Sequence, residues 1–288
     1  MDFSSSEVFP QIVISLIIVS VIFFVYIIVE QIYRAWFAFS SVRIPILNCT
    51  ASSGVPIPPS NIVLPYSENQ LTGIEFSYTG FVYISSDTDD GTDGWRTIFY
   101  KGYTGTGSSM SQLLAPGVFV SSANSGNSSP TLRVVMNTYD NWFNTIDVEQ
   151  IPFNKWFHLA IVLRKNSLEV YINGNLASKK SFNGTLPYQN YEPLNIFPNM
   201  KTPTTVFDNT QNNPTSSSMG IPPGESMTVN GKFSGFLSNL YYFSYAVTYS
   251  EIQAMLNMGP SSSTCSVNGG NLDQPPYLID TWWTQQKN

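Results

Sequence analysis

The chain has 288 residues, of which 42 % are hydrophobic and 14 % aromatic, but only 11 % are charged. Its 13 basic and 19 acidic residues give a net charge of -6 without a cluster of Lys and Arg, so no nucleic-acid partner is expected. One His and two Cys cannot build a multi-histidine or four-thiolate metal site.

An apolar segment near the start predicts a helix that crosses a membrane. Residues 12–29 contain no charge, Pro or Gly, and with their apolar flanks they reach the roughly 20 residues that span a bilayer. A cleaved signal peptide fits less well, because acids precede the run and no small-residue cleavage site follows it. A buried core helix is the remaining alternative. The residues interpreted as the membrane anchor are Ile12, Leu16, Ile22, Phe23, Tyr26 and Trp36.

The orientation of this anchor is set by charges that flank it. Arg34 and Arg43 follow the apolar run and only acids precede it, so the positive-inside rule places the rest of the chain on the cytosolic side. N-glycosylation patterns at Asn48, Asn127 and Asn183 argue for the opposite side. Such triplets also arise by chance in a chain rich in Asn, Ser and Thr. We therefore favour the cytosolic side.

After the anchor, residues 1–43, the sequence changes character twice. Residues 44–69 are rich in Pro and predict an extended, semi-rigid connector. Residues 70–260 contain short alternating segments separated by turn signals, which predict an all-β sandwich of antiparallel strands. Within it, residues 157–163 are almost continuously apolar, as in a central strand covered on both faces. Asn173-Gly174 supplies the two positive-φ residues of a tight hairpin.

An acidic loop is the most distinctive polar feature of the predicted sandwich. Asp87, Asp89, Asp90 and Asp93 place four carboxylates in one short, glycine-containing loop, and Ca²⁺ prefers such oxygen ligands in proteins. The loop lacks the distal bidentate Glu of an EF-hand, and a solvated turn explains the same residues. We favour the solvated turn and expect no cofactor, and Ca²⁺ is the one ion for which the sequence offers an alternative.

Several stretches of the sandwich resemble laminin-G-like domains. Residues 155–162 and 168–174 resemble the W-x-H-(L/V)-A…L-x-(V/L)-Y-x-(N/D)-G core of that family. Residues 233–241 and 247–252 are similar to its closing strand and short helix, and residues 76–85 with 95–102 to its opening strands. The resemblance implies a concanavalin A-like jelly roll of two antiparallel sheets. It implies little about function, because this fold hosts lectins, adhesion modules, glucanases and structural proteins.

A short helix and two interaction segments complete the chain. Thr248 and Glu251 match a capping box, and Gly259 stops the helix that they begin. Residues 202–231 form a polar insertion longer than a sandwich needs. The tail, residues 261–288, is aromatic without helical or strand periodicity, and it needs a surface to bury it. That surface is either the flank of the sandwich or another subunit. The tail residues expected to contact a partner are Tyr277, Trp282 and Trp283.

Cys49 and Cys265 lie near the two ends of the predicted domain. One disulfide between them would close the domain, and two separate thiols are an equal alternative. Two cysteines do not fix the redox compartment.

The sequence offers no arrangement for catalysis. Jelly-roll glucanases carry paired acids on one strand, whereas Glu149, Glu169 and Glu251 each stand alone among non-acidic neighbours. The only histidine, His158, falls in the predicted central strand, where we expect a hydrogen-bonded structural residue. The chain is therefore not expected to be an enzyme.

The anchor, the laminin-G-like domain and the uncharged polar surface together resemble membrane-anchored minor capsid proteins of large icosahedral double-stranded-DNA viruses. In such particles a bilayer lies beneath the capsid. The resemblance implies a structural protein of the virion membrane, with the bilayer and other capsid proteins as partners and its main domain facing the capsid. The alternative is a membrane-displayed, Ca²⁺-dependent glycan-binding module, or an adhesion module.

Overall fold

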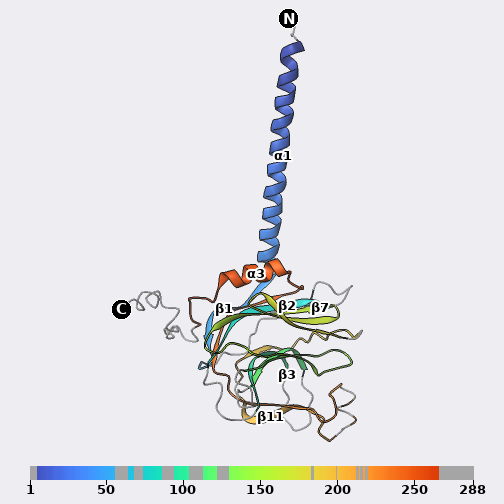
Figure 1. Cartoon of the computed structure of the whole chain (residues 1–288), viewed down its shortest axis with the longest axis vertical. Coiled ribbons are helices and arrows are strands. Elements are labelled where there is room, and N and C mark those ends of the chain that lie inside the picture. The colour runs from blue at the N-terminus through green and yellow to red at the C-terminus, as the bar shows by residue number, and fades with distance from the viewer. Residues whose placement is uncertain are drawn as a thin grey trace, which may run out of the picture. The chain divides into compact units, whose positions relative to one another are not determined.

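The chain forms two compact units, Met1–Arg43 and Ile44–Asn288, which are described separately (Figure 1). The computed structural model describes residues 5–55, 64–67, 74–85, 94–103, 113–121, 130–182, 185–198, 200–211, 214, 217 and 220–265.

The first unit is a single long helix, α1 (Ser5–Val42). Its segment Pro10–Ile32 has a mean hydropathy of 3.3 and no buried residue, so by length and composition it could cross a membrane. A signal sequence meets the same criteria. The hydroxyl of Ser15 donates a hydrogen bond to Ile12 O (2.8 Å), which satisfies this polar group inside the helix. The predicted anchor residues Ile12, Leu16, Ile22, Phe23 and Tyr26 lie exposed within this segment, and Trp36 lies further along α1.

The second unit is a sandwich of two β-sheets, which confirms the predicted fold class. The first sheet contains, in spatial order, β1 (Arg43–Ser52), β13 (Gly235–Phe243), β2 (Phe76–Ile84), β7 (Trp156–Arg164), β8 (Ser167–Ile172) and β9 (Asn175–Ser181). The second contains β11 (Met200–Asp208), β12 (Ser226–Gly231), β3 (Trp95–Tyr103), β4 (Leu113–Ser121), β5 (Leu132–Met136) and β6 (Asn144–Val148), with β10 (Leu194–Ile196) paired to β3. Neighbouring strands such as β2 and β7 run antiparallel, whereas β12 and β3 run parallel.

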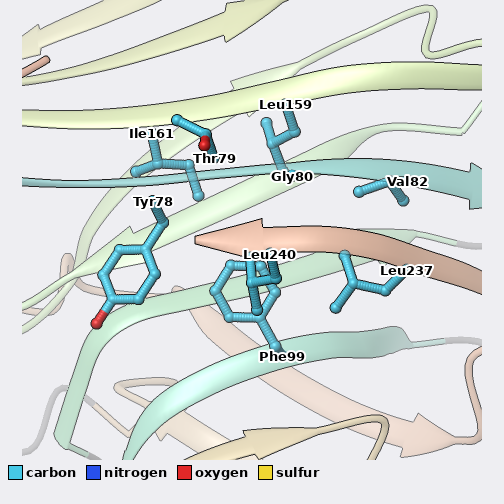
Figure 2. A pocket seen from close by; sticks show the side chains of 9 residues that line it. All are labelled: Tyr78, Thr79, Gly80, Val82, Phe99, Leu159, Ile161, Leu237 and Leu240. Atoms are coloured by element: carbon cyan, nitrogen blue, oxygen red, sulfur yellow. The ribbon is translucent and has the colours of Figure 1, made fainter. Parts of the chain in front are cut away.

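The hydrophobic core lies between the two sheets. Figure 2 shows Tyr78 and Leu240 from the first sheet beside Phe99 from the second, and the rings of Tyr78 and Phe99 lie 6.0 Å apart. The gap that these side chains line has no room for a water-sized molecule, so it is part of a packed core and not a ligand cavity. As predicted, β7 is a central strand, because it lies between β2 and β8 and its residues 157–163 are all buried.

Local sequence signals are confirmed at a turn and at a helix. Asn173 (φ 50°) and Gly174 (φ 77°) join β8 to β9 in the predicted tight hairpin. Helix α3 (Tyr249–Met258) begins at Thr248 with both halves of the capping box present, and Gly259 follows its last turn. Figure 1 shows α3 lying across the first sheet, on the face that points away from the second sheet.

Two segments differ from expectation because they form strands. The predicted connector begins with β1, whose Ile44, Ile46 and Leu47 pack against the core. Pro45 does not prevent this, because β1 is the edge strand of its sheet, where a missing N–H is tolerated. The predicted insertion 202–231 likewise contributes most of β11 and all of β12, which pair antiparallel. Their buried apolar side chains, among them Val206, Met227 and Val229, were hidden among polar neighbours in the sequence.

Candidate functional site

A covalent clamp joins the strand that follows α1 to the segment that follows α3. Cys49 on β1 and Cys265 form a disulfide with their Cα atoms 5.2 Å apart, so of the two alternatives for these cysteines the structure contains the bridge. The Thr50 N–H donates to Ser263 O (2.7 Å), and the Cys265 N–H donates to Thr50 O (2.9 Å). Residues 261–265 therefore run parallel to β1 at Thr50 and Thr264.

Buried hydroxyl groups reinforce this clamp. Oγ1 of Thr50 lies 2.7 Å from Ser261 O and 2.9 Å from Oγ of Ser238 on β13. The Ser261 N–H donates to the same Ser238 Oγ (2.8 Å). Thr50 and Ser238 are both buried, where an unpaired hydroxyl would cost free energy. Three segments that are distant in the sequence are thus fixed at one edge of the first sheet.

A groove of about 490 Å³ opens beside the clamp. It is lined by Ser52, Ser53 and Gly54, by Ser85, which follows β2, and by residues 232–236. The Ser85 N–H donates to Ser234 O (3.0 Å) and the Gly235 N–H donates to Ser53 Oγ (3.0 Å), so hydrogen bonds tie the three walls together. A glycine is required at position 235, because a Cβ there would lie 2.1 Å from Tyr83 O.

An aromatic cluster flanks the groove on the outer face of the first sheet. Phe236, Tyr83 and Trp156 come from β13, β2 and β7, and their ring centroids lie 5.6 to 6.3 Å apart. All three side chains are half-buried, so part of each ring remains exposed to solvent. The groove and the cluster together offer serine hydroxyls, the exposed Lys232 and partly exposed rings. Such a surface can hold a ligand or a protein segment that has both polar and apolar faces.

The acidic loop, for which a solvated turn and a Ca²⁺ site are the two interpretations, lies outside the described residues. Asp87, Asp89, Asp90 and Asp93 fall between Ser85, where the described chain stops at the groove wall, and Gly94, where it resumes. Within the described ranges, no group of three or more His, Cys, Asp or Glu side chains could hold a metal ion. The predicted contact residues Tyr277, Trp282 and Trp283 also lie outside the described part of the chain.

Two of the three acids considered for catalysis, Glu169 and Glu251, serve structural contacts, and the third, Glu149, lies exposed. Glu169 on β8 accepts hydrogen bonds from Lys179 (2.7 Å), Arg164 (3.0 Å) and the Tyr171 hydroxyl (3.0 Å). Burial alone would raise the pKa of Glu169, but these three donors outweigh it and lower the pKa. The carboxylate of Glu251 completes the capping box of α3. A carboxyl group that acts as a general acid needs a raised pKa, whereas the pKa of Glu169 is lowered.

His158 is buried as predicted, but its expected hydrogen bonds are wrong. It lies between the core residues Phe157 and Leu159 on β7, so its side chain points to the outer face of the sheet. The ring is 1 % exposed, packs against Phe81 at 5.0 Å, and finds no hydrogen-bond partner for either nitrogen among the described residues. This burial lowers the pKa of His158 to about 4.

Helix α3 explains why this outward-facing residue is buried. Ser238, Phe81 and His158 are register neighbours on β13, β2 and β7, and all three are buried on the outer face. Asn239 at one end of this row donates to Gly259 O (2.9 Å), and Gln253 donates to Gly174 O at the other (3.1 Å). The helix therefore crosses the row and covers it.

Comparison with known proteins gives one family match and several distant structural similarities. The model of a family described as the concanavalin A-like lectin/glucanases superfamily matches residues 59–208. The receptor binding domain of botulinum neurotoxin D is 12 % identical, with a TM-score of 0.43, over 69 % of this chain and 40 % of that chain. Trypanosoma rangeli sialidase is 14 % identical, with a TM-score of 0.38, over 65 % of this chain and 23 % of that chain.

This chain thus spans less than half the length of these solved structures. No curated protein matches its sequence.

Proposed function

The chain belongs to the concanavalin A-like lectin/glucanases superfamily, and from this premise we propose that it is a non-enzymatic structural protein anchored in a membrane. In this proposal α1 lies in the bilayer, the sandwich is a spacer, and the aromatic tail contacts neighbouring proteins. A minor capsid protein of a large icosahedral double-stranded-DNA virus, which links the capsid to the internal membrane, fits this description. Its partners are then lipid and other capsid proteins.

The observation that supports this proposal best is the clamp at the edge of the first sheet. The strand that follows α1 and the first residues of the tail, 261–265, are joined by the Cys49–Cys265 bridge and by backbone hydrogen bonds at Thr50. A protein that ties two structures together needs its two attachment segments fixed to each other. Catalysis places no such demand on the chain ends.

Removing residues 272–288 from the full chain is the test of this proposal. The sandwich should keep its circular dichroism spectrum, while incorporation into particles or partner complexes should fall. Trp282→Ala alone should weaken the partner interaction by about 30-fold, because buried Trp anchors contribute about 2 kcal/mol at protein interfaces. The matched control is Gln285→Ala in the same tail. Unchanged incorporation of the truncated chain would overturn the proposal.

Binding of a glycan with Ca²⁺ is a second candidate function, favoured by one observation. The acidic loop follows Ser85 in the sequence, and Ser85 lines the groove beside the aromatic cluster. Calorimetry of the full chain in detergent, with Ca²⁺ and a panel of glycans, tests this candidate. Saturable binding that Asp89→Ala abolishes, and that Asp140→Ala elsewhere on the surface leaves intact, would favour a lectin. No heat change with any glycan would exclude it.

Two signals bear on which side of the membrane the sandwich faces, and they oppose each other. Arg34 and Arg43 favour the cytosolic side, which is the capsid-facing side in this proposal. The disulfide requires an oxidising environment when it closes, and the cytosol keeps thiols reduced. Once a particle has left the cell, the cell no longer keeps its thiols reduced, so the bridge can close there.

Intact-mass measurement tests the adhesion alternative, which predicts glycan at Asn127 and Asn183.

A further inference from the structure

We propose that the Cys49–Cys265 disulfide conducts tension directly between α1 and the tail, so that the sandwich stays folded under mechanical load. The two cysteines are 216 residues apart in the sequence, but their Cα atoms are 5.2 Å apart. A force applied before Cys49 and after Cys265 passes through the bridge, because the bridge is by far the shorter of the two covalent paths. The proposed function supplies only the origin of the load.

The position of the bridge places the whole core inside the closed loop. Strands β2 to β13 and helix α3 all lie between the two cysteines in the sequence. Of the sandwich, only residues 43–48 of β1 precede Cys49. Extending the bridged chain from its ends can therefore straighten these few residues and the tail, but it cannot pull on the strands that form the core.

Without the bridge, the same pull would act on weak contacts. Residues 261–265 are held to β1 by the backbone hydrogen bonds of Thr50 with Ser263 and Cys265, and by hydroxyl contacts of Thr50 and Ser238. The two segments run parallel, so pulling them from opposite ends shears this small set of bonds. Once they break, β1 separates from β13 and the core opens.

Single-molecule force spectroscopy of the full chain in detergent, with handles at its two ends, tests the inference. In the oxidised protein we expect no long unfolding step. After reduction, or in the Cys49→Ser/Cys265→Ser variant, the sandwich should unfold and release roughly 700 Å, because extended chain spans about 3.3 to 3.6 Å per residue. If the double variant does not fold, folded wild-type protein can be held under low force and then reduced, and the same long unfolding step is expected.

A second pulling geometry separates load bypass from general stabilisation. Tyr191 is 74 % exposed and lies inside the closed loop. With one handle moved from the tail to residue 191, the oxidised protein should unfold, and its shorter arm, residues 191–265, should open by roughly 250 Å. A bridge that only stabilises the fold would raise the unfolding force equally in both geometries.

Two results would overturn the inference. One is a step of about 700 Å in oxidised protein whose bridge is shown to be intact by thiol alkylation and mass measurement. The other is oxidised protein that resists unfolding equally from residue 191 and from the tail. Neither result depends on the partner of the tail. Conversely, normal incorporation of the chain that lacks residues 272–288 would remove the proposed function and leave the bypass intact.

Discussion

Replacing Cys49 and Cys265 by serine is expected to lower the free energy of unfolding of the sandwich by about 5 kcal/mol. The bridge closes a loop of 216 residues, and a closed loop of this size removes much of the conformational freedom of the unfolded chain. The bridge also holds edge strand β1 in place, where Ile44, Ile46 and Leu47 cover part of the core. Natural domains have about 5 to 15 kcal/mol of stability, so the loss is a large share of the total.

Urea unfolding of the full chain in detergent, followed by tryptophan fluorescence, measures this loss. The single variant Cys49→Ser should lose as much stability as the double variant, since either substitution removes the bridge. Adding a reductant to the wild-type protein should reproduce the loss, whereas the same reductant should not affect the double variant. A difference below about 1 kcal/mol between wild-type and double-variant protein would show that the bridge does not constrain the unfolded chain.

Lowering the pH from 7 to 4 is expected to destabilise the sandwich by up to about 3 kcal/mol through His158 alone. Burial lowers the pKa of His158 to about 4 in the folded protein, whereas an exposed histidine titrates near 6.5. Between these two values the unfolded chain binds a proton that the folded protein excludes. Stability is therefore fully present above pH 6.5, falls as the pH drops towards 4, and does not fall further from this group below that.

Comparison of wild-type protein with His158→Leu isolates this effect from the titration of carboxylates. Leucine fits the apolar surroundings beside Phe81 and does not titrate. The wild-type free energy of unfolding, measured by urea titration at several pH values, should fall more steeply between pH 6.5 and 4 than that of the variant. Parallel pH profiles for the two proteins would contradict the burial of a neutral imidazole beneath α3.

Features with a local signal could be predicted from the sequence. The hairpin at Asn173-Gly174 depends on two residues that tolerate positive φ, and the capping box depends on Thr248 and Glu251, three positions apart. The central strand β7 can be recognised by its continuous apolar run, because a strand with one exposed face alternates apolar and polar residues. Each of these signals lies within one element, so no knowledge of its partners was needed.

Features made by distant segments could not be predicted in the same way. The sequence of β1 predicts a connector and not a strand, because its pairing partner β13 lies far along the chain and Pro45 is unusual in a strand other than an edge strand. The groove is formed by residues 52–54, 85 and 232–236, none of which is distinctive by itself. The hydrogen bonds expected for the His158 ring were wrong, because nothing in the sequence shows that α3 lies over its face of the sheet, where neither ring nitrogen finds a partner among the described residues.

The central claim is that this chain links a bilayer to a neighbouring protein. Cross-linking followed by mass spectrometry, on the full chain in its native membrane, tests that claim most directly. The account predicts that chains which retain the apolar segment Pro10–Ile32 cross-link through residues 266–288 to a different protein. Cross-links from the tail only to its own sandwich, or chains from which Pro10–Ile32 has been cleaved, would contradict it.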